Sequence, residues 1–255
     1  MMTITHVDKF YKGRQVLADI NFEIDRGEVL GLVGESGCGK STLARLLGGY
    51  EKPDGGAVLF EGQEVARLRG RALKSFRQHC QMVFQDNLAS LNPSMKLLAS
   101  LREPLNNNFD LSQTAADHQI RELMAEVSLR ENILPKLPVA VSGGERQRAN
   151  ICRALLAGPK LMICDEITSS LDVITQKRLL KLLKHLNAQG LTILFISHDI
   201  DAVKSISHRV MVMGRGSIVE TLHREDGFKG TNPYTQKLFE ALPIRHPSQR
   251  AALAV

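Results

Sequence analysis

The chain has 255 residues, a length that suits one large α/β domain or two smaller ones. With 43% apolar and 24% charged residues, it is expected to be a globular protein with a substantial core. No apolar run approaches the roughly 20 residues of a membrane span, and the polar N-terminus lacks the apolar centre of a signal peptide, so we expect a cytoplasmic protein. The net charge of +6 is spread over separate clusters, and with no tryptophan and only three tyrosines a base-stacking surface for nucleic acid is not expected.

Apolar runs and alternating patterns predict strands and helices that alternate along the chain. The predicted strands are Thr3–Val7, Val16–Ile24, Val29–Val33, Ala57–Phe60, Gln81–Phe84, Leu161–Cys164, Thr192–Ile196, Arg209–Met213 and Ser217–Thr221. The predicted helices are Lys40–Leu47, Thr114–Val127, Gly144–Ala157, Val173–Ala188 and Ile200–Ser205. This order favours an α/β fold with a mostly parallel sheet covered on both faces, and the strands before residue 29 alternate as in an antiparallel sheet.

One region departs from this alternation. From about Leu88 to Val141 the sequence has no convincing strand, several prolines and the polar tract NNNFDLSQT. We interpret it as a helical insertion, and we expect the asparagine triplet Asn106–Asn108 to form a loop.

The stretch GESGCGKST, from Gly34 to Thr42, predicts a phosphate-binding loop between a strand and a helix. Glycines allow the loop to curl so that successive backbone N–H groups point at one anion, and the helix starting near Lys40 adds its positive dipole end. Lys40 can reach the outer phosphates, and the Ser41 hydroxyl can complete the ligand shell of a magnesium ion. Cys38 is expected to be a packing residue. The candidate binding residues are Gly34, Ser36, Gly37, Cys38, Gly39, Lys40, Ser41 and Thr42.

Polar residues follow three predicted strands, at the carboxyl ends where α/β proteins bind ligands. Asp165 and Glu166 follow the apolar run LMIC, and because side chains alternate along a strand the two need not share a role. Asp165 suits the magnesium shell, and Glu166 suits the attacking water. His198 follows TILFIS and could contact the terminal phosphate or polarise the water. Gln85 follows QMVF, and its amide could reach both metal and water.

A second anion-binding helix start is predicted far from the first in sequence. In VSGGERQR, Ser142 with Gly143 and Gly144 precedes a predicted helix, an arrangement that caps the helix and presents backbone N–H groups. One nucleotide does not obviously need two such sites. The second is explained if it serves a nucleotide held by another copy or by a partner.

Together and in this order, the motifs strongly resemble the nucleotide-binding subunit of an ABC transporter over nearly the whole chain. GESGCGKST resembles the Walker A loop, Gln85 the Q-loop, and SGGERQ, which contains Glu145, the signature motif. LMICDE resembles Walker B with its catalytic glutamate, SSLD at positions 169–172 the D-loop, and His198 the switch histidine. Tyr11 lies where this family stacks an aromatic ring on adenine.

The resemblance implies a RecA-like P-loop NTPase core with an antiparallel β-subdomain and a helical subdomain that carries the signature. Residues 1–245 would form a single ABC ATPase domain, with the helical subdomain at roughly 88–150 and a C-terminal tail at 246–255. Two subunits, identical or paralogous, would hold two ATP molecules with Mg²⁺, each between one Walker A loop and the other subunit's signature. The protein would sit peripherally on the cytoplasmic face of the inner membrane, against permeases that dock near Gln85. An extracytoplasmic binding protein would deliver the solute.

Finer features resemble the peptide/nickel import branch of the family. These are VFQDNLASLNPSM and NPYTQKLFEALP, while VMVMGRGSIVET, LREPL and DEITSSLDV are most similar to the nickel and metallophore members. Ile167 replaces the proline that usually follows the catalytic glutamate. One alternative stays open, a soluble ABC ATPase that serves an enzyme complex such as a carbon–phosphorus lyase assembly. An ATPase acting on nucleic acid would carry a long coiled-coil insertion or tandem cassettes, and neither is present.

Overall fold

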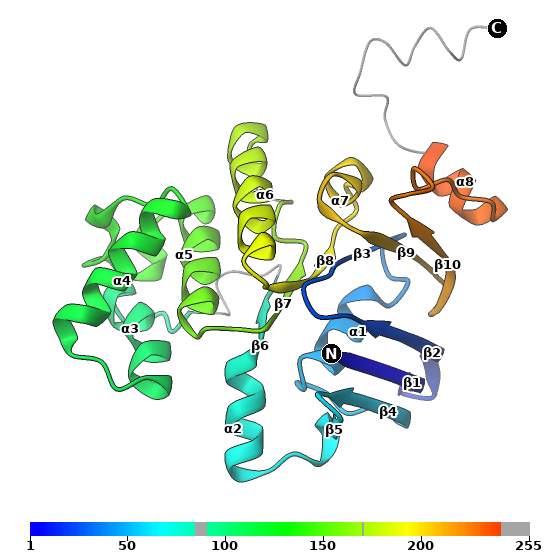
Figure 1. Ribbon diagram of the computed structural model, residues 1–255, viewed down its shortest axis with the longest axis horizontal. Helices are drawn as coiled ribbons and strands as arrows, with labels where there is room; N and C mark the ends of the chain where they lie inside the picture. The colour runs from blue at the N-terminus through cyan, green and yellow to red at the C-terminus, as the bar shows by residue number, and fades with distance from the viewer. Residues whose placement is uncertain (85–90, 170, 241–255) are drawn as a thin grey trace, which may run out of the picture.

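The computed structural model describes residues 1–84, 91–169 and 171–240, and the strands within these ranges form two sheets (Figure 1). The larger sheet consists, in spatial order, of β10 (Ser217–His223), β9 (Arg209–Gly214), β3 (Val29–Gly34), β8 (Thr192–Ile196), β7 (Leu161–Asp165) and β6 (Cys80–Val83). It is parallel apart from the antiparallel β9–β10 pair. The smaller, antiparallel sheet consists of β2 (Arg14–Ile24), β1 (Met2–Tyr11), β4 (Gly55–Phe60) and β5 (Gln63–Glu64).

Helices cover the larger sheet on one face, and the smaller sheet with two further helices, α1 and α2, covers the other (Figure 1). The helices are α1 (Lys40–Leu47), α2 (Gly70–His79), α3 (Leu97–Asn108), α4 (Gln113–Glu126), α5 (Gly143–Leu156), α6 (Val173–Ala188), α7 (Ile200–Ile206) and α8 (Pro233–Glu240), with short 3₁₀ turns at Val65–Arg67, Glu131–Ile133 and Pro138–Ala140. Helices α3, α4 and α5 form a group at one side of the molecule, and α1 lies between the two sheets. In the described part of the chain, no helix has the length and apolar character needed to cross a bilayer.

The central strand β3 shows how one strand serves two cores. Its side chains alternate between faces, so Val29 and Val33 join the core under the helices, while Leu30 and Leu32 join the core with α1 and the smaller sheet. A strand buried on both faces needs a continuous apolar run, and VLGLV supplies it. The predicted mostly parallel sheet and the antiparallel N-terminal strands are therefore confirmed.

Every predicted strand and helix is found, three of them with the predicted ends and the others with somewhat shifted ends. The prediction for the asparagine triplet was wrong. Asn106–Asn108 form the last turn of α3 and not a loop. Leu97, Leu101 and Leu105 are spaced by four residues and are all buried. Because this face packs against the core, the helix continues past Pro104 and includes the three asparagines, which are poor helix formers.

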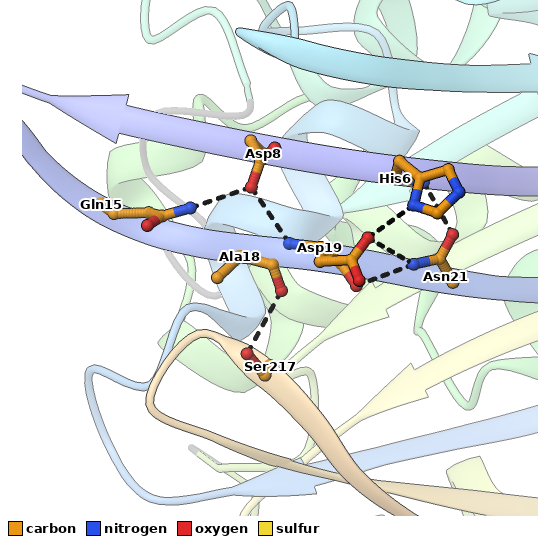
Figure 2. Close-up of polar contacts among 7 residues, drawn as sticks. All are labelled: His6, Asp8, Gln15, Ala18, Asp19, Asn21 and Ser217. Carbon is orange, nitrogen blue, oxygen red and sulfur yellow. Dashed lines mark hydrogen bonds and ion pairs between the residues drawn. The ribbon is translucent and has the colours of Figure 1, made fainter.

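A polar cluster fixes an irregular part of the β1–β2 pairing (Figure 2). His6 and Asp19 both have positive φ angles, 48° and 49°, beside register shifts in the ladder. Asn21 Oδ1 accepts the backbone N–H of His6 at 2.8 Å, and Asp8 Oδ1 accepts that of Asp19 at 3.0 Å. Side chains thus satisfy backbone groups that the regular ladder does not pair.

The turn between β9 and β10 joins three separate segments. The backbone N–H of Ala18 on β2 donates to Gly216 O at 2.9 Å, and Gly216 N–H donates to Cys38 O at 3.0 Å. Ser217 Oγ donates to Ala18 O at 3.2 Å (Figure 2). Arg215 and Gly216 have φ angles of 48° and 83°, as expected for a tight hairpin turn. This turn therefore ties the smaller sheet to the loop that follows β3.

Candidate nucleotide-binding site

The loop between β3 and α1 lies so close to its neighbours that glycine is required in it. Gly39 has a φ angle of 113°, and a Cβ built there would lie 2.8 Å from Leu17 Cδ2 and 3.1 Å from the carbonyl oxygen of Val16. Among the described residues, no side chain caps the first turn of α1, which leaves its backbone N–H groups for an anion. Helix α1 begins at Lys40, as predicted.

Lys40 is buried and folds back over this loop. Its Nζ donates to the carbonyl oxygens of Gly34 and Glu35, both at 2.8 Å. It also lies 3.9 Å from the Sγ of Cys38, a buried thiol whose pKa burial raises. The buried position of Cys38 agrees with its predicted packing role.

An open cleft runs along the loop in two connected parts. A cavity of about 300 Å³ is lined by Val16, Ser36, Gly37, Gly39, Lys40, Ser41, Thr42, Glu166 and His198. A neighbouring cavity of about 720 Å³ is lined by Tyr11, Arg14, Gln15, Val16, Glu35, Ser36, Gly37, Cys38, Arg215 and Gly216. The two share Val16, Ser36 and Gly37, so an elongated ligand could extend from Lys40 to Tyr11.

The residues that follow β7 and β8 place a carboxylate and an imidazole at the smaller cavity. Glu166 follows β7 with only 10% of its side chain exposed, whereas the side chain of His198, after β8, is 67% exposed. His198 Nδ1 lies 2.8 Å from Glu166 Oε2. The backbone N–H of Glu166 donates to Ile196 O at 3.0 Å, which fixes the end of one strand against the other.

Asp165, the last residue of β7, is more deeply buried than Glu166. Burial raises the pKa of Asp165, while a hydrogen bond from Ser41 and the charge of Lys40 act against that rise. Within the described residues its Oδ1 has no hydrogen-bond partner. A buried carboxylate oxygen without a partner, beside a serine hydroxyl, fits a hard cation that prefers oxygen ligands.

The predicted residues of the second anion site lie elsewhere. Ser142 caps α5: its Oγ accepts the backbone N–H of Glu145 at 3.3 Å, and Glu145 Oε2 accepts the backbone N–H of Ser142 at 2.9 Å. Neither of the two cleft cavities is lined by described residues of α5, so Gly143 and Gly144 are separated from Lys40 within one chain. Gln85, the middle of the SSLD stretch and the tail at 246–255 lie outside the described residues.

Sequence reasoning missed part of the cleft lining. Arg14, Gln15 and Val16 come from the start of β2, and Arg215 and Gly216 from the β9–β10 turn. The turn could have been recognised as a hairpin from the RG pair between two strand runs, but its place beside the loop after β3 depends on tertiary contacts.

Comparison with known proteins now identifies the family. The ABC transporter family model matches residues 17–169, more than half of the chain. The chain belongs to the ABC transporter family. It is 43% identical over 243 residues to a probable peptide ABC transporter ATP-binding protein of Sinorhizobium fredii, covering 94% of this chain and 69% of that protein. It is 40% identical over 237 residues to a nickel import ATP-binding protein of Brucella suis, covering 91% and 89%.

Solved structures agree with this assignment. The ABC cassette MJ0796, in a dimeric post-hydrolysis state bound to ADP and Pi, has a TM-score of 0.80 and 26% identity to this ABC protein, over 90% of this chain and 100% of that one. The ABC protein described here is thus an ATPase and the ATP-binding subunit of an importer. The predicted RecA-like P-loop core with its antiparallel and helical subdomains is confirmed.

Proposed function

We propose that this ATPase drives uptake of a small solute of the peptide or nickel class, including metal–metallophore complexes. The relatives described above are peptide and nickel importer subunits, and they do not favour a role in an enzyme complex. The proposed ATP hydrolysis is supported by one observation. Four side chains line the same cleft, those of Lys40, Ser41, Glu166 and His198, and Asp165 next to Glu166 is buried.

Each of these side chains has a chemical task in ATP hydrolysis. Lys40 would bind the outer phosphates once its contacts with the loop carbonyls are exchanged for phosphate oxygens. Glu166 would accept a proton from the attacking water, and His198 would orient Glu166 and contact the terminal phosphate. Gln85 would complete the site next to metal and water.

Asp165 and Ser41 would hold a magnesium ion, together with Gln85. The unpartnered Oδ1 of Asp165 and the nearby Ser41 hydroxyl suit this ion. When bound, Mg²⁺ would neutralise charge that develops on the phosphate oxygens. Tyr11 would stack on the adenine at the wider end of the cleft.

A second ATP-binding subunit, identical or paralogous, would supply the other half of each site. Ser142, Gly143, Gly144 and Glu145 would contact the nucleotide held by the partner's Walker A loop. The separation of α5 from the cleft and the dimeric state of the related cassette support this arrangement. Residues 1–245 would form one ATPase domain whose helical part spans roughly 88–150, with a tail at 246–255.

The dimer would dock on membrane permeases at the cytoplasmic face of the inner membrane. A binding protein outside the cytoplasm would deliver the solute to those permeases. Nucleic acid is not among the proposed partners.

Uptake assays test this function directly. In a strain that lacks this protein, uptake of radiolabelled nickel and of a labelled oligopeptide is measured after complementation with the wild type, Lys40→Ala or Lys52→Ala. The wild type and the exposed-site control Lys52→Ala should restore one of the two activities. Lys40→Ala should not, since loss of a charge-assisted hydrogen bond costs about 1.5–3 kcal/mol of ATP binding. Normal uptake of both solutes in the deletion strain, with recovery of the protein in a soluble enzyme complex, would contradict the proposal.

A further inference from the structure

The hydroxyl of Tyr11 is held by a carboxylate from the segment that follows α1. Tyr11 Oη donates to Glu51 Oε2, and Arg45 Nε donates to the other oxygen of Glu51 at 2.7 Å. The Nη2 of Arg45 lies 3.3 Å from Thr42 Oγ1, to which it donates. A chain of side-chain hydrogen bonds therefore runs from the aromatic ring to the first turn of α1.

The backbone that carries Tyr11 is fixed by the same segment. Phe10 N–H donates to Asp54 Oδ2 at 2.7 Å, and Lys9 Nζ donates to Lys52 O at 2.8 Å. With its backbone fixed, the ring of Tyr11 keeps only the rotations about its own side-chain bonds. The hydrogen bond to Glu51 restricts the rotation about Cα–Cβ, and because a phenolic O–H prefers to lie in the plane of its ring, it also favours one orientation of the ring about Cβ–Cγ.

This network is partly shielded from water, unlike an ordinary surface ion pair. The side chain of Glu51 is 26% exposed, and that of Arg45 is 38% exposed. Burial alone would raise the pKa of Glu51, but the hydrogen bonds from Tyr11 and Arg45 outweigh it and lower that pKa. Glu51 is therefore ionised at neutral pH and can accept both bonds at once.

We propose that Glu51, supported by Arg45, is a positioning residue that orients the Tyr11 ring for the base of the nucleotide before the nucleotide binds. The inference rests on the proposed function, in which Tyr11 stacks on adenine. A ring that is already ordered loses less rotational freedom on binding, so the network raises affinity for nucleotides but not for free phosphate chains.

The test compares two ligands with the same number of phosphates, ADP and inorganic pyrophosphate, by isothermal titration calorimetry. Glu51→Ala should weaken ADP binding about 3- to 10-fold, the effect of freeing one side chain, and should leave pyrophosphate binding within about twofold. Glu64→Ala is the matched control, since Glu64 on β5 also pairs with an arginine, Arg67 at 2.8 Å, and is not among the described residues that line the cleft. It should change neither affinity.

A double-mutant cycle shows whether Glu51 acts through the tyrosine hydroxyl. Tyr11→Phe keeps the exposed ring and removes the hydroxyl, so it should weaken ADP binding as much as Glu51→Ala does. Adding Glu51→Ala to Tyr11→Phe should then cause no further loss.

Three results would overturn the inference: additive losses in the double variant, equal losses for ADP and pyrophosphate, or no loss with Glu51→Ala. If Tyr11→Ala weakens ADP binding while Glu51→Ala does not, only the positioning role of Glu51 is wrong. If Lys40→Ala also leaves ADP binding intact, the proposed nucleotide site itself is wrong.

Discussion

Glu166 has a backbone conformation that its residue type rarely adopts. Its φ angle is 54°, in the left-handed region, which costs a non-glycine residue of the order of 1–3 kcal/mol. Ser169 Oγ, which donates to the carbonyl oxygen of Glu166 at 2.8 Å, and the backbone bond to Ile196 hold it there. This backbone conformation directs the Glu166 side chain toward His198 and the cleft.

Glu166→Gln should therefore separate binding from hydrolysis. The amide keeps the size and backbone strain of the glutamate but cannot take a proton, so ATP hydrolysis should fall by about 10²- to 10⁴-fold. ATP affinity should stay near that of the wild type, because Lys40, Ser41 and Asp165 are unchanged. Steady-state hydrolysis and filter binding of labelled ATP measure the two quantities. A variant with near-normal turnover would remove Glu166 from the catalytic role.

At the scale of elements, β3 and α7 approach each other closely at a glycine. A Cβ at Gly31 would lie 2.3 Å from Val203 Cγ1 and 2.7 Å from Ser207 Oγ, closer than real side chains come. Helix α7 starts directly after His198 and Asp199, so its distance from β3 also determines where His198 lies.

Gly31→Ala should displace α7 and destabilise the fold by about 1–3 kcal/mol, a typical cost of overpacking. Urea denaturation would measure the change in the free energy of unfolding. In the double variant Gly31→Ala/Val203→Ala, the methyl group that clashes with the new Cβ is absent, so part of the lost stability should be recovered. The effects of the two substitutions on the free energy of unfolding should therefore be strongly non-additive. Simple addition of the two losses would show that the contact does not limit packing here.

Helix α8 is attached to β10 through one carboxylate. Glu220 Oε1 accepts the backbone N–H and the hydroxyl of Thr231 at 2.7 and 2.8 Å, just before α8 begins. Burial alone would raise the pKa of Glu220, but the nearby hydroxyl of Thr235 and the hydrogen bonds from Thr231 and Asn232 outweigh it and lower the pKa from 4.5 to about 2.

The contribution of Glu220 to stability should therefore depend on pH in a defined window. A carboxylate whose pKa is lowered by folding stabilises the protein fully above pH 4.5, and this stabilisation is lost as the pH falls from 4.5 toward 2. Glu220→Gln should lower the urea midpoint at pH 6, and the difference from the wild type should shrink as the pH is lowered through 4 and 3. A difference that stays constant with pH would show that the charge of Glu220 is not what holds the turn.

Elements with a long apolar run or a clear apolar repeat were predictable from the sequence, with α3 as the exception. Its buried leucines repeat every four residues, but Pro104 and the three asparagines are poor helix formers and conceal that repeat. Strand β8 and helices α1 and α6 have the predicted ends, because β8 is one apolar run and the apolar residues of the two helices repeat with a clear period. Helices α2 and α8 were missed because their apolar faces are short and lie in largely polar segments. In α2 only Leu73 and Phe76 pack against the core, and in α8 Tyr234, Leu238 and Phe239 do so. The loop residues of the site follow from local chemistry, whereas the contact of Tyr11 with Glu51 joins positions 40 residues apart and needs the fold.

At the scale of the whole molecule, the capped start of α5 is not among the described residues that line the cleft of its own chain. If Ser142 serves a partner's nucleotide, Ser142→Arg should leave ATP affinity of the isolated subunit nearly unchanged and abolish cooperative hydrolysis of the assembled pair. Ser112→Arg is a matched control, because Ser112 also caps a helix, accepting Ala115 N–H at 3.3 Å. It should cost a similar amount of helix stability, about 1 kcal/mol, without affecting hydrolysis. A fall in single-subunit affinity as large as that of Lys40→Ala would refute the shared site.

The turn at Gly216 has a consequence for how nucleotide leaves. Its backbone bonds to Ala18 and Cys38 join the strand beside the proposed base site to the loop of the proposed phosphate site. Opening the cleft between this strand and this loop would break backbone hydrogen bonds, which opposes the release of ADP by that route. We expect the rate of nucleotide exchange to be governed from outside the fold, by how often the two ATPase subunits separate. Permeases that keep the two ATPase subunits apart or together would therefore control the rate of the transport cycle.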